Sequence, residues 1–537
     1  MTDHAIAPLL HRVAARLGER DALRWRDRRW TWAELDRRFN QFANLLLEAG
    51  IGGDADHEGL AGWESPHDHV ALMATNGNEY LEAMIGSFGA RAAPVNVNYR
   101  SVADELRHVL TDCRARALVF HSRYAPVVNE VRQALPDLTL LLQIADESGN
   151  DLLSGAGWYT ASVDAASPER PPTEPSPDDH YVLYTGGTTG KPKGTLWRQG
   201  DFLHTALAVR DDLDTVLDRA VRRSLTVLAT PPFMHGAAHW NLLSGWIGGA
   251  TVVIQDDPTR LDPADVLSTV ERHQVSSLLI VGDAFAQPLL AELETGRHDP
   301  SSLRFLLSGG AVLSANAKQR FLAAIPGLRV VDLLGSSETG NQGTRSSSTS
   351  AEIERDFERA PTTVVLSSDR SRVLGADDDE WGWLAQSGRV PRGYLGDPLK
   401  SAETFPEVSG VRYAVAGDRV RPGPDDTFTF GGRDSVTINT GGEKVFAEEV
   451  EEALRAHRSV IDVTVVGCPD ERWGQMVVAV VSLDGQPSDD DLRAAATTIA
   501  GYKLPRAFVR VDEVVRSPSG KPDYEWARRT AVEALAT

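Results

Sequence analysis

Residues 184–194 read YTGGTTGKPKG, and this stretch gathers glycines, three threonines and two lysines within eleven positions. Adjacent glycines allow several backbone N–H groups to converge on one anion. Thr185, Thr188 and Thr189 would add hydroxyl donors. Lys193 would add positive charge. The stretch therefore predicts a loop that binds phosphate, with an ordinary glycine-rich hairpin as the alternative if the motif stood alone.

The loop differs from the nucleotide-binding P-loop, which needs GxxxxGK followed by Ser or Thr. If Lys191 closes the GK pair, Thr185 stands at the first glycine position and Pro192 stands where the hydroxyl is needed. Pro192 also lacks an N–H and disfavours a helical conformation at Lys191. We therefore expect the chain to leave the loop as an extended segment.

Length and composition limit the classes of protein. A chain of 537 residues exceeds one ordinary hydrophobic core, so at least two domains are expected. The formal charge of -21 repels nucleic acid backbones and anionic membrane surfaces. Cys113 and Cys468 are too few for a disulfide framework or a thiolate metal cluster. With no signal-peptide pattern and no apolar run of membrane-spanning length, we expect a cytoplasmic enzyme that binds no nucleic acid.

Short apolar runs alternate with helical periodicity along most of the chain. A helix is predicted over residues 30–50, with Gly50 as its C-cap. Buried strands are predicted at 70–75, 117–121, 224–230, 276–282 and 328–335. Such alternation is typical of α/β layers with largely parallel sheets.

Two polar segments are predicted to be connections. Residues 167–180 are proline-rich and acidic, which indicates an exposed connection into the phosphate loop. Residues 343–356 are predicted to be a surface loop. The pattern changes to a compact βα alternation after FTFGGRDSVTINTGGEKVFAEEVEEALRAH (428–457), and we place a domain boundary near Arg433.

Six further motifs follow the phosphate loop in order. They are PPFMHGAAHW (231–240), LLSGGAVLS (306–314), DLLGSSETG (332–340), YAVAGDRV (413–420), GGRDSVTINTGGEKVFAEEVE (431–451) and SPSGKPD (517–523). Together with YTGGTTGKPKG they resemble the signature of the adenylate-forming superfamily, which includes acyl-CoA synthetases, adenylation domains of peptide synthetases and luciferases. Seven ordered motifs that span most of the chain favour kinship over chance.

The resemblance implies an α/β fold. A large N-terminal domain of layered sheets and helices, residues 1–432, would precede a small mobile α+β domain, residues 433–537, with a hinge near Ser435. The local sequences TLWRQGDF, INTGGEKVFAEEVE and RSPSGKPDYEWA resemble those of the actinobacterial branch that acts on steroid side-chain, terpenoid or long-chain carboxylic acids.

The same resemblance implies a two-step reaction that uses ATP, Mg²⁺ and coenzyme A. A carboxylate would attack the α-phosphorus of ATP, so cationic groups must neutralise the developing charge. Lys521 resembles the lysine that bridges the carboxylate and the α-phosphate. Glu338 resembles the magnesium ligand. Thr188 would complete the catalytic set within the phosphate loop.

The nucleotide contacts follow from the matched motifs. Asp418 would accept both ribose hydroxyls, Asp332 would accept the adenine amino group, and Leu334 stands where relatives often stack an aromatic ring on adenine. The full predicted ATP and AMP set is Thr185, Gly186, Gly187, Thr188, Thr189, Gly190, Lys193, Gly309, Gly310, Ala311, Asp332, Leu334, Ser337, Asp418 and Arg433.

The two other substrates have their own predicted residues. The acyl group would contact His235, His239 and Trp240, although histidines beside small residues are often packed core groups. Coenzyme A would contact Gly441, Gly442, Glu443 and Lys503, with the glycines leaving a tunnel for the pantetheine arm. A turn between two strands and a surface lysine are the alternatives for these positions.

We therefore expect an acid–thiol ligase that converts a bulky hydrophobic carboxylic acid to its CoA thioester by way of acyl-AMP. One alternative is an enzyme that mainly performs the thioesterification half on supplied acyl-AMP, or one that loads a carrier protein. Another is a catalytically silent protein that binds acyl-adenylate. A homodimer, and a separate adenylating or downstream acyl-transfer enzyme as a partner, stay open.

Overall fold

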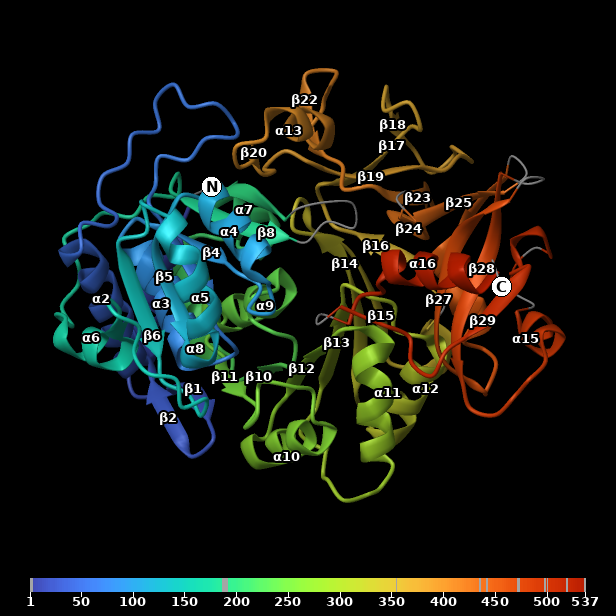
Figure 1. Cartoon of the computed structure of the whole chain (residues 1–537), viewed down its shortest axis with the longest axis horizontal. Helices are drawn as coiled ribbons and strands as arrows, with labels where there is room; N and C mark the ends of the chain where they lie inside the picture. Colours follow the sequence, from blue (N-terminus) through green and yellow to red (C-terminus); the bar gives the residue numbers. More distant parts are fainter. Residues whose placement is uncertain are drawn as a thin grey trace.

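The structure is a computed structural model that describes residues 3–185, 192–353, 355–433, 436–440, 443–470, 474–496, 499, 501–517 and 520–535. Its strands form three sheets, and helices pack around them (Figure 1). The red C-terminal segment lies beside α11 (Gly282–Leu293) and α12 (Ala315–Ala324), on the side opposite the blue N-terminal elements.

One sheet carries the phosphate hairpin. Its order is β20-β9-β8-β4-β3-β5-β6-β7, and strands β8 to β7 run parallel while β9 and β20 are antiparallel additions. All residues of β3 are buried, as expected for a strand covered on both faces. The strands are β3 (His69–Met73), β4 (Ala93–Asn96), β5 (Ala115–His121), β6 (Leu140–Ile144), β7 (Gly157–Trp158), β8 (His180–Thr185), β9 (Lys193–Arg198) and β20 (Gly393–Tyr394).

The largest sheet runs in the order β18-β17-β19-β23-β24-β16-β15-β14-β13-β12-β10-β11-β1-β2, with β22 beside β19 and β21 beside β22. It is parallel from β14 to β1 and antiparallel at both ends. Its strands are β1 (Asp21–Trp25), β2 (Arg28–Thr31), β10 (Thr226–Ala229), β11 (Thr251–Ile254), β12 (Ser277–Ile280), β13 (Phe305–Gly309), β14 (Arg329–Ser336), β15 (Gly340–Ser347), β16 (Phe357–Arg359), β17 (Thr363–Leu366), β18 (Val373–Leu374), β19 (Gly382–Ser387), β21 (Glu407–Val408), β22 (Val411–Ala414), β23 (Asp418–Pro422) and β24 (Thr427–Arg433).

The C-terminal sheet is built from β25 (Thr437–Thr440), β26 (Glu443–Phe446), β27 (Val460–Asp470), β28 (Gly474–Leu483) and β29 (Ala507–Arg510). Its order is β26-β25-β28-β27, and β29 pairs with β28. The last strand of the largest sheet ends at Arg433 and this sheet begins at Thr437. The boundary near Arg433 and the hinge stay predictions, and Ser435 lies outside the described residues.

The remaining helices cover the sheets. They are α1 (Ile6–Leu17), α2 (Trp32–Glu48), α3 (Asn78–Gly89), α4 (Ala103–Asp112), α5 (Ala125–Val131), α6 (Tyr159–Ala165), α7 (Gln199–Thr205), α8 (Leu213–Arg222), α9 (Gly236–Ile247), α10 (Pro263–His273), α13 (Pro398–Thr404), α14 (Ala447–Leu454), α15 (Asp489–Ala495) and α16 (Tyr524–Leu535). Within the described ranges, none of the helices has both the length and the apolar character needed to span a membrane.

The structure confirms the five predicted strands, as β3, β5, β10, β12 and β14, and corrects the predicted helix at its start. The helix begins at Trp32, because Thr31 and Glu34 form a capping box that fixes the first turn. Trp30 instead belongs to β2. Gly50 follows the helix with a positive φ of 69°, while Ala49 is the C-cap.

Two predicted connections are partly wrong. Gly343–Ser347 is the second half of β15, which pairs antiparallel with β14, so strand pairing overrides the polar composition of this segment. In the connection 167–180 half of the residues are exposed, but Pro171 is buried, and so are Asp179 and His180 at its end, where the backbone enters the core as β8.

Candidate active site

The phosphate hairpin is closed by Thr185 and Lys193, which face each other at the ends of β8 and β9. Lys193 Nζ donates to Asp397 Oδ2 at 2.6 Å, and this hydrogen bond lowers the pKa of the Asp397 carboxyl. The five predicted contacts between the strands, Gly186, Gly187, Thr188, Thr189 and Gly190, lie outside the described residues.

Tyr394 joins the hairpin to the SSETG turn. It lies on β20, which pairs with β9, and its hydroxyl donates to Glu338 Oε1 at 2.8 Å. Lys193 Nζ lies 5.8 Å from the centre of the Tyr394 ring. The turn is also tied to the hairpin by Trp197 Nε1, which donates to the backbone oxygen of Ser337 at 2.9 Å. The structure thus brings the predicted phosphate and metal residues together.

The surroundings of Glu338 suit a hard cation. A carboxylate offers about four acceptor positions, and Tyr394 occupies one of them. Neighbouring oxygen donors are the hydroxyls of Ser336 and Thr339, which are hydrogen-bonded within the same turn. Magnesium prefers oxygen ligands of this kind and retains several waters. The residues present therefore fit Mg²⁺.

Lys521 reaches from the C-terminal segment to the end of β13. A Cβ built on Gly310 would lie 3.5 Å from Lys521 Cε, an ordinary van der Waals distance, so the lysine side chain packs directly beside this glycine. Burial first, and then the charge of Lys521, lower the pKa of His235 to about 3. Lys521 therefore lies near both Gly310 of the SGGA segment and His235 of the MHGAAH segment.

A tight turn presents Lys521. Ser517 N donates to Lys521 O at 2.8 Å, and Gly520 N donates to Ser517 O at 2.8 Å. Gly520 has a φ of 75°, and a Cβ there would lie 3.1 Å from the Phe285 ring of α11. Arg516, just before the turn, makes two 2.6 Å contacts with Asp462. The turn is thus packed against the N-terminal part of the molecule.

The predicted nucleotide residues lie at strand ends. Gly309 ends β13, Gly310 and Ala311 follow it, and Asp418 opens β23 opposite Arg433 of β24. Asp418 is buried, and the side chain of Arg433 lies outside the described parts.

Two further residues of this set lie on β14. Asp332 Oδ2 accepts from Lys318 Nζ at 2.6 Å and from Arg345 Nε at 2.8 Å. Leu334 packs against the cluster of Phe357 and Phe428. An adenine contact of Asp332 or Leu334 stays a prediction.

The three predicted acyl contacts differ in their surroundings. His239 is buried, donates from Nδ1 to Phe233 O at 2.7 Å, and accepts at Nε2 from the Tyr181 hydroxyl at 2.5 Å. Trp240 Nε1 donates to the same hydroxyl at 2.9 Å. Burial lowers the pKa of His239 to about 4, so this ring is neutral near pH 7. His235 is the histidine that lies near Lys521, while His239 and Trp240 direct their polar atoms into the core.

The predicted CoA residues are less fully described. Gly441 and Gly442 lie outside the described residues, and of Glu443 only the backbone, at the start of β26, is described. Lys503 Nζ contacts both oxygens of Glu449 on α14, at 2.6 and 2.8 Å. The structure therefore pairs Lys503 within its own domain.

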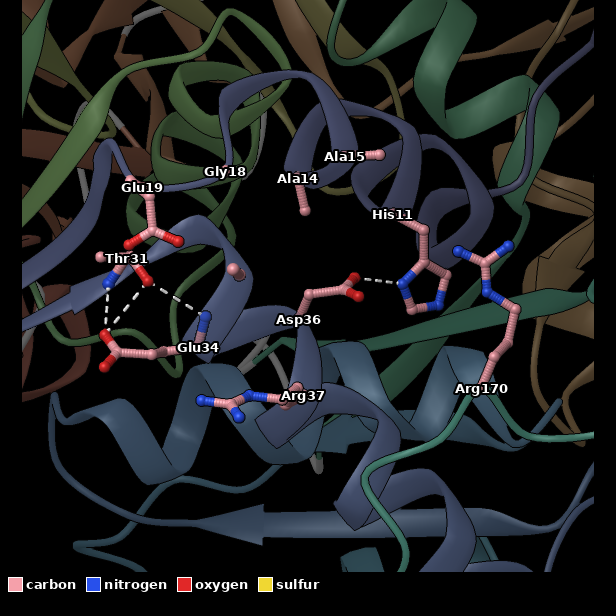
Figure 2. A pocket seen from close by; sticks show the side chains of 11 residues that line it. His11, Ala14, Ala15, Gly18, Glu19, Thr31, Glu34, Asp36, Arg37 and Arg170 are labelled. Carbon is pink, nitrogen blue, oxygen red and sulfur yellow. Dashed lines mark hydrogen bonds and ion pairs between the residues drawn. The ribbon is translucent and has the colours of Figure 1, made fainter.

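The surface has two hollows that differ in their distance from these residues. The first lies beside the Lys521 turn, and the second lies elsewhere. One of about 560 Å³ is bordered by Tyr99, Arg100 and Phe285 on one side and by Arg516 and Gly520 on the other. A second hollow, of about 590 Å³, lies between α1 and α2 and contains the ion pair of His11 and Asp36 (Figure 2). Of the predicted site residues that the structure describes, none lines the second hollow.

Sequence reasoning missed Tyr394 and Asp397, which hold the predicted phosphate and metal residues. Both occur in the stretch RGYLGDP, whose glycine and proline indicate a turn. The sequence shows only that an aromatic residue and a carboxylate lie in such a turn. No spacing rule predicts that they contact residues 193 and 338. Pairing of β20 with β9 makes the connection.

The AMP-binding enzyme family matches residues 10–382, and the AMP-binding enzyme C-terminal domain matches residues 449–521. The chain belongs to the AMP-binding enzyme family. Within this family it is 46% identical to the medium-chain acyl-CoA ligase Mig of Mycobacterium avium, over 97% of each chain. It is 37% identical to 3-oxocholest-4-en-26-oate--CoA ligase of Rhodococcus rhodochrous, over 97% of this chain and 95% of that protein.

A solved structure confirms the fold. The crystal structure of the anthranilate CoA ligase AuaEII in complex with anthranoyl-AMP has a TM-score of 0.83 at 23% identity, covering 100% of this chain and 98% of that one. The predicted α/β architecture, with a large N-terminal and a small C-terminal part, is thereby confirmed.

Proposed function

We propose that this AMP-binding enzyme is an acyl-CoA ligase that joins a hydrophobic carboxylic acid to coenzyme A through acyl-AMP. The approach of Lys521 to Gly310 and His235 is the observation that carries the proposal. This approach brings a cation of the C-terminal domain to the end of β13, where the resemblance puts the nucleotide. The relatives that act on medium-chain acids and on 3-oxocholest-4-en-26-oate support a hydrophobic substrate.

In the first step, a carboxylate oxygen of the acid forms a bond to the α-phosphorus, and the bond to pyrophosphate breaks. Lys521 would neutralise charge shared by the carboxylate and the α-phosphate. Lys193 and the threonines of the hairpin would orient the outer phosphates. When bound, Mg²⁺ would supply further charge neutralisation, and Glu338 would hold it. His235 is neutral near pH 7 and so adds no positive charge beside Lys521.

In the second step, the thiol sulfur of coenzyme A attacks the acyl carbon and AMP leaves. The predicted residues for this step are Gly441, Gly442, Glu443 and Lys503. Lys503 is paired with Glu449, so it would reach a CoA phosphate only by exchanging that partner. We propose that the C-terminal domain rotates near Ser435 between the two steps.

The compartment that we propose is the reducing cytoplasm, which suits the buried free thiols of Cys113 and Cys468. A homodimer stays a prediction.

The test separates the two half-reactions over a panel of medium-chain, long-chain, steroid and terpenoid acids. Pyrophosphate release is measured with ATP and acid alone, and thioester formation is measured with synthetic acyl-AMP and CoA. We expect both reactions, with the hydrophobic acids preferred over acetate. Reaction of supplied acyl-AMP alone would favour the second candidate, a thioesterifying enzyme, for which Leu334 in place of an aromatic residue is the supporting observation. Activity in neither assay would contradict the ligase proposal.

A further inference from the structure

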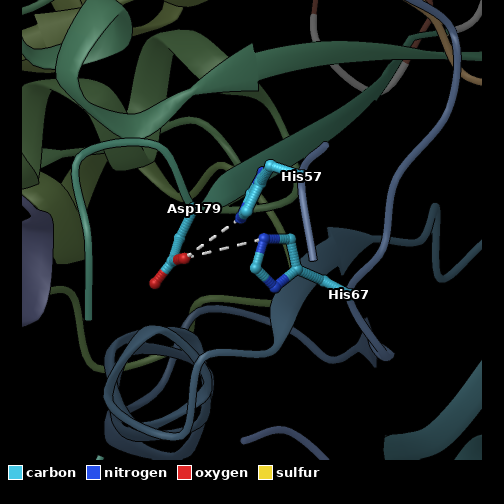
Figure 3. Close-up of side chains that lie close together, drawn as sticks. All are labelled: His57, His67 and Asp179. Atoms are coloured by element: carbon cyan, nitrogen blue, oxygen red, sulfur yellow. Dashed lines mark ion pairs between the residues drawn. The ribbon is translucent and has the colours of Figure 1, made fainter. Parts of the chain in front are cut away.

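Two histidines and an aspartate converge at the start of β8, away from the proposed active-site residues. His57 and His67 belong to the segment 52–68 that precedes β3, and Asp179 precedes β8. The Nε2 atoms of His57 and His67 lie 3.6 and 3.8 Å from Asp179 Oδ1. All three ligand atoms lie within 4.8 Å of one another. Both rings point at the carboxylate (Figure 3).

The hydrogen-bond partner of His67 fixes which ring nitrogen faces Asp179 with a lone pair. Its Nδ1 lies 2.9 Å from the backbone oxygen of Arg91, and a carbonyl oxygen only accepts. Nδ1 therefore carries the hydrogen of the neutral ring, and Nε2 is an acceptor directed at a carboxylate oxygen. Among the described residues, Nε2 of His57 and Nε2 of His67 are buried without a hydrogen-bond partner. His67 Nε2 and Asp179 Oδ1 are thus two acceptors that face each other, and a cation between them would stabilise this arrangement.

Three imidazole rings gather at this position. The ring of His180 packs 5.1 Å from that of His67 and 5.2 Å from that of His57. Neutral imidazole is the form of histidine that ligates transition metals.

Asp179 is held in place by Arg91 and Ser176. Arg91 Nη2 donates to Oδ1 at 2.9 Å, the single N–H of Arg91 Nε is shared between Oδ1 at 3.3 Å and Oδ2 at 3.1 Å, and Ser176 N donates to Oδ2 at 2.9 Å, so three donors act on the carboxylate. Arg91 also contacts Asp54, which offsets its positive charge. A carboxylate has about four acceptor positions, so Asp179 keeps acceptor capacity toward the histidines. Such oriented carboxylates and Nδ1-bonded histidines are the usual surroundings of metal ligands.

We propose that His57, His67 and Asp179 bind a divalent transition-metal ion of the zinc class. Bonds of about 2.0–2.2 Å in a tetrahedral site put ligand atoms about 3.3 Å apart, which is close to the observed 3.6 and 3.8 Å. The side chains of His67 and Asp179 are each 1% exposed, whereas that of His57 is 23% exposed, so a water ligand could enter beside His57. The ion would tie the segment 52–68 to the start of β8.

The proposal is tested by titrating metal into the full-length, tag-free protein after dialysis against EDTA. Calorimetry with ZnCl₂ is expected to give one ion per chain, and the thermal midpoint should rise on addition of Zn²⁺. Co²⁺ should bind with the visible absorption of a tetrahedral nitrogen and oxygen site. Excess Mg²⁺ should not compete, since it prefers six oxygen ligands. Absence of stoichiometric Zn²⁺ binding would overturn the proposal.

Variants locate the ion. His67→Ala and His57→Gln are expected to weaken Zn²⁺ binding at least about hundredfold and to abolish the thermal shift, in line with the sensitivity of metal sites to their ligands. His298→Ala is the matched control, because His298 pairs with Glu292 elsewhere on the molecule. Should His67→Ala fail to fold, His57→Gln decides alone, since its side chain is the more exposed. Unchanged affinity in His57→Gln contradicts the assignment.

Discussion

Two lysines of the C-terminal domain are held in opposite ways. Lys521 extends to the N-terminal domain, beside Gly310 and His235, whereas Lys503 pairs with Glu449 of its own domain. The first lysine is proposed for adenylation and the second for CoA binding. Of these two lysines, only Lys521 lies at the N-terminal domain in the observed arrangement, which is consistent with the rotation that we propose between the two half-reactions.

Charged side chains lie at the contact between the N-terminal and C-terminal domains. Arg455 is the C-cap of α14, and its side chain is 9% exposed, with Nε 3.7 Å from Asp283 of α11 and Nη2 3.7 Å from Glu451. These separations exceed those of good hydrogen bonds, and breaking the Asp283 contact leaves Arg455 with Glu451 in its own domain. The contact therefore stabilises the arrangement without locking it.

The largest effect is expected when Lys521 is replaced. Lys521→Ala should lower pyrophosphate release about 10²- to 10³-fold, because a cation aimed at developing charge is lost. Thioester formation from supplied acyl-AMP should stay within a few-fold of the unaltered enzyme. Lys503→Ala is the matched control and should spare pyrophosphate release. Equal loss of both half-reactions in Lys521→Ala would contradict the division between the lysines.

The next effect concerns Glu338, the proposed magnesium ligand. Glu338→Gln should lower pyrophosphate release at least about tenfold, with partial recovery at high Mg²⁺, because a neutral amide is a weaker ligand for a hard cation. Rates are measured over a Mg²⁺ titration. Tyr394→Phe keeps the carboxylate and removes its hydrogen bond, so its loss should be smaller. A Glu338→Gln rate that does not respond to Mg²⁺ would count against the metal role.

A substitution of Gly520 tests the contact between the Lys521 turn and α11. Gly520→Ala should lower pyrophosphate release about tenfold, because the added Cβ meets the Phe285 ring and the positive φ costs about 1–2 kcal/mol. Thioester formation from acyl-AMP should change little. Gly485→Ala is the control, since Gly485 has a φ of 83° and open space around it. Equal losses in both variants would show that backbone strain, not the contact, matters.

The smallest effect is on stability rather than rate. Burial raises the pKa of Glu451 to about 7, from an ordinary value of 4.5. The folded state therefore binds the proton more tightly than the unfolded state, and the stability gained is lost as pH rises from about 4.5 to about 7. Chemical denaturation at several pH values should show this decline. Glu451→Gln cannot ionise and should flatten it, whereas an unchanged slope would assign the decline to other groups.

The sequence predicted the family and the main layers because both rest on local patterns. Ordered motifs identified the adenylate-forming enzymes, and apolar runs located β3, β5, β10, β12 and β14. The ligase class is likewise confirmed by the curated relatives.

The failures have one physical cause. Residues 343–347 are polar, yet they form a strand because β14 supplies hydrogen-bond partners that no local pattern reveals. Tyr394 contacts Glu338, and Asp397 contacts Lys193, only because distant strands pair. The histidines of residues 57 and 67 meet Asp179 in the same way. Contacts between residues far apart in the chain are set by topology, which the sequence alone did not supply.

The bond between Lys193 and Asp397 has a consequence for how the protein is made. These residues are 204 positions apart, so the ribosome must add the whole intervening chain before the hairpin gains this partner. At about 5–20 residues per second, the wait is roughly 10 to 40 s. During that time β9 lacks its neighbour β20 and presents an unpaired strand edge in the nascent chain. The hairpin is therefore synthesised early, but it gains its pairing with β20 late.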